Sequence, residues 1–174
     1  MLDWLSPERG LYQIRCAVLD GQSNRIGSAY EWIEVPQFAP SQLSLSSLLL
    51  SEQKGEDGQN SQGPPDPRDF ALNIERRFSR TSRLLCQTYI YNARTTDGAP
   101  RITVQVNLLS DKEVIATGPP QLLTLTGLKD VQRIPYFVPI SLKLLPAGGY
   151  TLQVIATDQV ANKSVSQEMD FTIQ

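Results

Sequence analysis

One stretch near the end of the chain constrains the fold more than any other, namely residues 144–158, LLPAGGYTLQVIATD. Its opening residues include a proline and two glycines, which favour a tight turn. From Tyr150 onward, apolar residues recur at every second position, at Leu152, Val154 and Ala156. This alternation predicts a β-strand with one buried face.

The turn before this strand is typical of a tyrosine corner, in which a tyrosine hydroxyl bonds to backbone a few residues upstream. Tyr150, Leu145 and Gly148 are its expected members. We expect Tyr150 to be buried, with its hydroxyl bonded to backbone between Leu144 and Ala147. Such corners occur in two-sheet proteins, so we predict an all-β, immunoglobulin-like or fibronectin III-like β-sandwich.

The first 36 residues repeat the pattern of the last strands with an offset of 138 positions, which places Tyr12 on Tyr150. We interpret residues 1–36 as a β-hairpin resembling the end of a preceding sandwich module, with Tyr12 as its corner tyrosine. The alternative is that any two amphipathic hairpins look alike. Further pairs under this offset are Ile14 with Leu152, Cys16 with Val154, Val18 with Ala156, Asp20 with Asp158, and Asn24 with Asn162.

The rest of the chain is interpreted as a linker, residues 37–40, and a main β-sandwich domain, residues 41–174. Residues 51–69 shift abruptly to Gly, Pro and acidic residues, which predicts a mobile loop. Beyond it, residues 83–92 are apolar on both faces, as expected of a central strand. Residues 134–142 contain two prolines, which cannot donate to a ladder, and so predict an edge strand.

Composition excludes several classes of chemistry. The chain contains no histidine, which removes Ser-His-Asp catalysis and His-ligated zinc or copper. The loop acids match no calcium-binding spacing. We therefore expect no catalytic residues, no metal and no cofactor.

The charge and hydropathy patterns argue against two further kinds of partner. The formal net charge of −2 provides no basic field for nucleic acid. The basic segment 76–83, RRFSRTSR, is interpreted as a solvated strand entry, with a phosphate-binding patch as the less favoured alternative. Apolar runs are too short to cross a membrane, and residues 1–4 do not resemble a signal peptide, so no membrane insertion is expected.

The two cysteines are expected to be buried free thiols that act as small core residues. Cys16 corresponds to Val154, an inward position that has no need of sulfur. The rival is a Cys16–Cys86 disulfide, because strands at such places are bridged in antibody domains.

Five aromatic residues form a candidate interaction surface: Trp4, Tyr30, Trp32, Tyr136 and Phe137. A row of exposed, coplanar rings on one face would favour a carbohydrate-binding module. The alternative for each ring is packing within the hairpin or at an edge strand.

Two further sets of segments carry a resemblance: residues 10–15, 25–29 and 33–36, and residues 77–80, 89–93 and 148–150. They resemble the C-terminal β-sandwich region of bacterial proteins, notably acidobacterial ones, that carry a von Willebrand factor type A domain upstream. The resemblance implies an exported or envelope-associated interaction module, hence an extracytoplasmic location, and a chain that is either a fragment of a longer one or a truncated relative. The type A domain itself is absent, so its metal-dependent binding is transferred to no residue here.

The expected function is therefore non-catalytic, as a structural or protein-interaction module, with carbohydrate binding as the alternative and an enzyme less favoured. The apolar face of the N-terminal hairpin lacks the other strands of its module. A lone two-stranded hairpin is marginal in water, and its open edges invite pairing. We expect the hairpin to dock, and a homodimer in which hairpins complete each other's sheets is the favoured arrangement.

Overall fold

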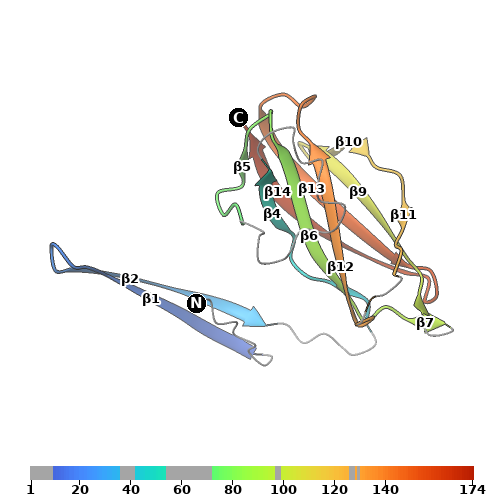
Figure 1. Cartoon of the computed structure of the whole chain (residues 1–174), viewed down its shortest axis with the longest axis horizontal. Coiled ribbons are helices and arrows are strands. Elements are labelled where there is room, and N and C mark those ends of the chain that lie inside the picture. The colour runs from blue at the N-terminus through green and yellow to red at the C-terminus, as the bar shows by residue number, and fades with distance from the viewer. Residues whose placement is uncertain (1–9, 36–41, 54–71, 97–98, 126–127, 129) are drawn as a thin grey trace. The chain divides into compact units, whose positions relative to one another are not determined.

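The computed structural model describes residues 10–35, 42–53, 72–96, 99–125, 128 and 130–174. Every regular element within these ranges is a β-strand (Figure 1), which confirms the all-β prediction. The chain divides into two compact units, Met1–Ala39 (unit 1) and Pro40–Gln174 (unit 2).

Unit 1 contains a long antiparallel hairpin of β1 (Gly10–Asp20) and β2 (Arg25–Val35). The strands pair without interruption from Gly10↔Val35 to Asp20↔Arg25. Asn24 closes the turn with a φ of 54°, a left-handed conformation that asparagine tolerates better than most residues.

The larger sheet of unit 2 has the strand order β10-β9-β13-β14-β5, with β11 also paired to β9. The pairs along this path are antiparallel except β14 with β5, which is parallel. The bounds are β5 (Arg77–Phe78), β9 (Ile102–Ser110), β10 (Glu113–Thr117), β11 (Gln121–Leu122), β13 (Gly148–Asp158) and β14 (Lys163–Ile173).

The second sheet has the order β12-β6-β3, with β4 also paired to β6. The segment with two prolines is therefore an edge strand, as predicted, and the predicted central strand lies inside the sheet. A separate small pair joins β7 to β8. The bounds are β3 (Ser44–Leu45), β4 (Leu49–Gln53), β6 (Arg83–Tyr91), β7 (Thr95–Thr96), β8 (Ala99–Pro100) and β12 (Arg133–Ser141).

The two sheets of unit 2 share one hydrophobic core. Leu84, Ile90 and Ile134 enter it from the second sheet, and Leu152 and Val154 enter it from the larger one; each is fully buried. Burying a side chain of this size stabilises the fold by about 1.5–3 kcal/mol. The core therefore depends on alternate residues of both sheets, as the sequence alternation predicted.

One predicted boundary is wrong. The loop expected at residues 51–69 begins too early, because Ser51–Gln53 belong to β4 and pair with Leu85, Leu84 and Arg83 of β6. Ser51 is buried although it is polar. These residues form strand because their backbone pairs with β6. Their polar side chains give no sign of this pairing. Residues 54–71 lie outside the described part of the chain.

Candidate interaction surfaces

The tyrosine corner has the geometry that the sequence predicted. Tyr150 is buried, and its hydroxyl donates a 2.8 Å hydrogen bond to the Pro146 carbonyl. Its ring stacks on Phe171 with centroids 5.8 Å apart. The hydroxyl is used within the fold, so the corner has a structural role.

The other expected corner residues support this turn. Leu145 donates its amide to the Leu142 carbonyl at 3.1 Å and packs against the core. Gly148 has a φ of 157°, a conformation that side-chain-bearing residues rarely adopt. Gly10 has a φ of 149° two residues before Tyr12, which is half-buried.

The hairpin of unit 1 repeats the β13–β14 hairpin of unit 2 residue for residue. Both bounds of β1 shifted by 138 give those of β13, and both bounds of β2 shifted by 138 give those of β14. The register is also the same, because Gly10↔Val35 corresponds to Gly148↔Ile173. The sequence repeat is thus a repeat of local structure.

The turns of the two hairpins agree in detail. Asn162 has a φ of 50°, matching Asn24. Asp20 accepts the Gln22 amide at 2.9 Å, and Asp158 accepts the corresponding Val160 amide at 2.8 Å. Hydrogen bonds from the Ser23 hydroxyl and from the Gln22 amide lower the pKa of Asp20 from its ordinary value.

The surroundings of the two hairpins differ. β13 pairs with β9 along the edge that faces away from β14, whereas the described part of unit 1 offers β1 no partner except β2. Leu152, Val154 and Ala156 are fully buried. Their counterparts on β1 are all exposed. The exposed fraction is 46% for Ile14 and 71% for Val18, and Cys16 is also exposed.

The prediction for the cysteines is half right. Both are free thiols and Cys86 is buried, but Cys16 is exposed. The alternation placed Cys16 on the correct face, yet the described part of unit 1 contains no strands that would cover this face. Burial raises the pKa of the Cys86 thiol to about 12, so at neutral pH it is protonated and unreactive.

The register divides the hairpin into two faces. The "Tyr12 face" corresponds to the buried face of β13–β14 and includes Tyr12, Ile14, Cys16, Val18, Ala29, Glu31 and Ile33. The "Trp32 face" corresponds to the outward face and includes Leu11, Gln13, Arg15, Leu19, Ile26, Tyr30 and Trp32.

The outward face of β13–β14 shows what the fold itself requires at these positions. It is polar, and hydrogen-bonded side-chain pairs cross it from strand to strand. These pairs are Thr151 with Asp170 at 2.7 Å, Gln153 with Glu168 at 2.6 Å, and Thr157 with Ser164 at 2.8 Å.

On the hairpin of unit 1, Tyr30 stands where β14 has Glu168, and Trp32 where it has Asp170. They are 68% and 54% exposed. Arg15 and Gln13 lie opposite them and are joined by a 2.5 Å hydrogen bond. This aromatic pair with a polar neighbourhood departs from the pattern that the fold requires.

The remaining predicted surface aromatics are not part of this group. Tyr136 is buried in the core of unit 2, so its expected place on an interaction surface is wrong. Tyr136 shares a face of β12 with Ile134, which is fully buried, so the alternation of the strand directs both side chains inward. Phe137 is half-buried, and Trp4 lies outside the described residues.

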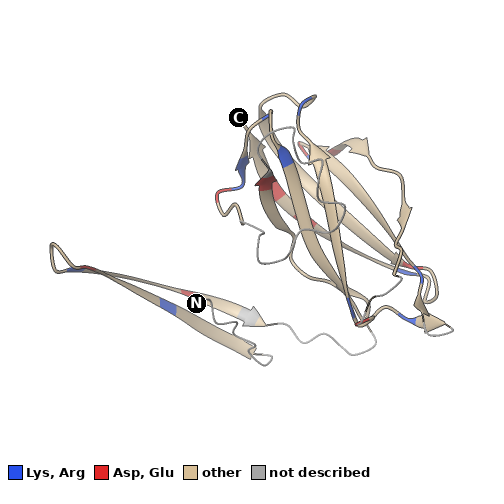
Figure 2. Cartoon of the chain, in the orientation of Figure 1, with Lys and Arg blue, Asp and Glu red and all other residues tan. Residues whose placement is uncertain are grey.

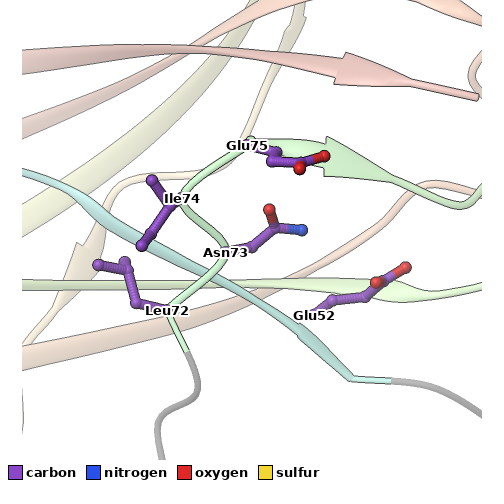
Figure 3. A pocket seen from close by; sticks show the side chains of 5 residues that line it. All are labelled: Glu52, Leu72, Asn73, Ile74 and Glu75. Atoms are coloured by element: carbon purple, nitrogen blue, oxygen red, sulfur yellow. The ribbon is translucent and has the colours of Figure 1, made fainter. Parts of the chain in front are cut away.

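A shallow hollow on unit 2 is lined by β4 and the segment before β5 (Figure 3). Its polar groups serve the fold, because Asn73 bonds to the Arg77 carbonyl at 2.8 Å and Glu52 accepts the Ser79 amide at 3.1 Å. Leu72 and Ile74 are exposed.

In the basic segment 76–83, the arginines are exposed, but the aromatic residue Phe78 is buried against Phe171. The ring is therefore not available to stack on a base. Arg76 directs Nη1 to the Met169 sulfur at 3.0 Å.

Charged residues occur on both strands of the hairpin of unit 1 and at its turn (Figure 2). Asp20 and Arg25 sit at its turn, as Asp158 and Lys163 do at the corresponding turn. Across the described ranges, no group of three His, Cys, Asp or Glu side chains is placed to hold a metal ion. Those ranges also contain no helix with the length and hydrophobicity needed to cross a membrane.

No protein-family model and no curated protein matches the chain.

Proposed function

We propose that this chain is a non-catalytic structural or protein-interaction module whose N-terminal hairpin is the docking element. The main domain, residues 41–174, is an immunoglobulin-like sandwich of the fibronectin III kind. The strand order supports this: the sheet with the path β12-β6-β3 shares its core with the sheet with the path β10-β9-β13-β14, and the chain passes from one sheet to the other between β12 and β13. The tyrosine corner lies at that crossing.

The observation that carries the docking role is the exposure of apolar side chains on both faces of the β1–β2 hairpin. Isolated hairpins are marginal in water, and unpaired strand edges attract other strands. Exposed apolar patches of this kind mark interaction sites. We also propose a location outside the cytoplasm of a bacterium, which rests only on the resemblance to bacterial proteins that carry a type A domain.

Photo-crosslinking in cells that naturally produce the protein tests this role. A photoreactive residue at Val18 should give adducts with a polypeptide, because Val18 is exposed on the Tyr12 face. The same residue at Glu113, on the exposed strand β10 of unit 2, is the matched control and should give far fewer. Absence of polypeptide adducts at position 18 would contradict the proposal.

Carbohydrate binding is the second candidate, because Tyr30 and Trp32 are exposed on one face. Aromatic rings offer apolar surface on which the C–H faces of sugars can stack. The chain has two tryptophans, so a Trp4→Phe background leaves Trp32 as the reporter. Titration with soluble polysaccharides should shift its fluorescence, and Tyr30→Ala should weaken binding; an unchanged spectrum across neutral and acidic glycans rejects this candidate.

A further inference from the structure

We infer that the β1–β2 hairpin is the closing hairpin for an incomplete sandwich of the same fold, one that lacks its own β13 and β14. This inference rests on the proposed docking role and names the partner. The occupant of the Tyr12 face and of the open β1 edge is a strand equivalent to β9 together with the facing sheet.

The β13–β9 interface shows what this occupant looks like. β13 pairs with β9 from Thr151↔Leu109 to Asp158↔Ile102. The equivalent edge of β1 runs from Gln13 to Asp20, which is uninterrupted strand of the same register. An acceptor with an open β9-like edge would continue this pairing without any change in the hairpin.

Side-chain sizes on the Tyr12 face match those that the acceptor must cover. Tyr12 replaces Tyr150 unchanged, and Ile14 replaces Leu152 with the same number of carbons. Cys16 and Val18 replace Val154 and Ala156, which are fully buried in unit 2. The first three positions nearly conserve side-chain volume, an exchange that cores tolerate well, whereas Val18 is larger than Ala156 by two carbons and requires an acceptor with more room at that position.

Glu31, an acidic residue on the Tyr12 face, also has a counterpart. Glu31 occupies the position of Met169, whose sulfur lies 3.0 Å from Nη1 of Arg76. An acceptor with an arginine at this place would give Glu31 a cation of opposite charge. Charge complementarity therefore favours an acceptor that resembles unit 2 itself.

A second copy of this chain is the rival occupant, as expected from the sequence. In each copy, however, β13 already occupies the long edge of β9. A second copy could offer its own hairpin, but that hairpin has neither a β9 equivalent nor a facing sheet within the described part of unit 1. The incomplete sandwich supplies both.

A fusion of the intact chain tests the inference. Under the offset of 138, Met1 corresponds to position 139, so an added copy of residues 40–138 joined directly to Met1 restores the native spacing. The hairpin should then close the added strands. Peptide-resolved labelling of Cys16, which is exposed in the chain alone, should slow by about 100-fold or more once local opening is required for reaction.

Matched variants locate the contact. In the fusion, Ile14→Asp should restore fast labelling of Cys16, whereas Gln13→Asp on the opposite face should not. A control fusion carries residues 148–173 in place of residues 10–35, with Val154→Cys as its reporter. Unchanged labelling of Cys16 in the test fusion, alongside protection in this control, overturns the inference.

The unfused chain separates the rivals. Slow labelling of Cys16 in a monomer would show that the hairpin docks on its own unit 2, and slow labelling in a dimer would show a second copy; either result overturns the inference. Both would leave the proposed docking role standing, because that role fails on the absence of polypeptide adducts at position 18.

Discussion

At the scale of single residues, the corner hydrogen bond offers a direct test. Tyr150→Phe removes the donor to the Pro146 carbonyl while keeping the ring that stacks on Phe171. The free energy of unfolding should fall by about 1–3 kcal/mol, the cost of leaving a buried polar partner unpaired. Tyr30→Phe, at an exposed ring, is the control and should leave the denaturation midpoint of unit 2 unchanged. An unaltered denaturation midpoint for Tyr150→Phe would contradict a structural role for the corner hydrogen bond.

The buried Cys86 thiol predicts a loss of stability in alkali. Burial raises its pKa from 9.0 to about 12, so between these values the unfolded chain releases a proton that the folded chain retains. The stabilisation is therefore complete below pH 9 and is lost as the pH rises towards 12, at up to about 1.4 kcal/mol per pH unit.

Urea unfolding between pH 8 and 10 would measure this slope. Cys86→Ala should be less stable at every pH because of the cavity, but its slope in this range should be smaller. Tyr136, whose pKa is also raised to about 12 by burial and by Cys86, adds to the loss mainly above its ordinary value of 10.0. Equal slopes for the two proteins would argue against a shifted thiol.

At the scale of elements, the turn of β13–β14 depends on Asp158. Its buried carboxylate accepts the amides of Val160 at 2.8 Å, Ala161 at 3.0 Å and, from another loop, Arg94 at 2.7 Å. Asp158→Ala leaves these donors without their acceptor and should cost about 2–4 kcal/mol. Asp20→Ala, at the equivalent turn of unit 1, should leave the unfolding of unit 2 unchanged. A small effect of Asp158→Ala would mean that water replaces the carboxylate.

The two hairpins also show how far sequence predicts structure here. Strand alternation, turn residues and the corner are local signals, and they predicted the strands, the Tyr150 hydrogen bond and the repeat. Burial is not local, because it depends on which strands cover a face. Cys16 was therefore assigned to the correct face of its strand but was wrongly expected to be buried. Ser51 was assigned to a loop, although it lies in β4 and pairs with β6.

The candidate site was predicted only in part. Tyr30 and Trp32 were among the aromatics singled out, but Tyr136 was assigned to the same group although alternation from Ile134 places it inward. The contrast between the Trp32 face and its polar counterpart on β13–β14 needs the register of both hairpins. Residues two positions apart in one strand lie on the same face, so Tyr30 and Trp32 could be grouped from the sequence. Whether residues of different strands lie on a common surface depends on the fold.

At the scale of the whole molecule, unit 2 should fold without the first 39 residues. Among the described residues, every member of its hydrophobic core lies between Leu43 and Ile173, so removing residues 1–39 takes away no core side chain. The truncated protein should match the full chain within about 0.5 kcal/mol in unfolding free energy, as expected for changes away from the core. Paired denaturation and sedimentation measurements on both proteins test this at tens of micromolar. A larger loss of stability in a protein of unchanged monomeric mass would place the hairpin on unit 2, and a dimeric mass for the full chain alone would assign the hairpin to a second copy.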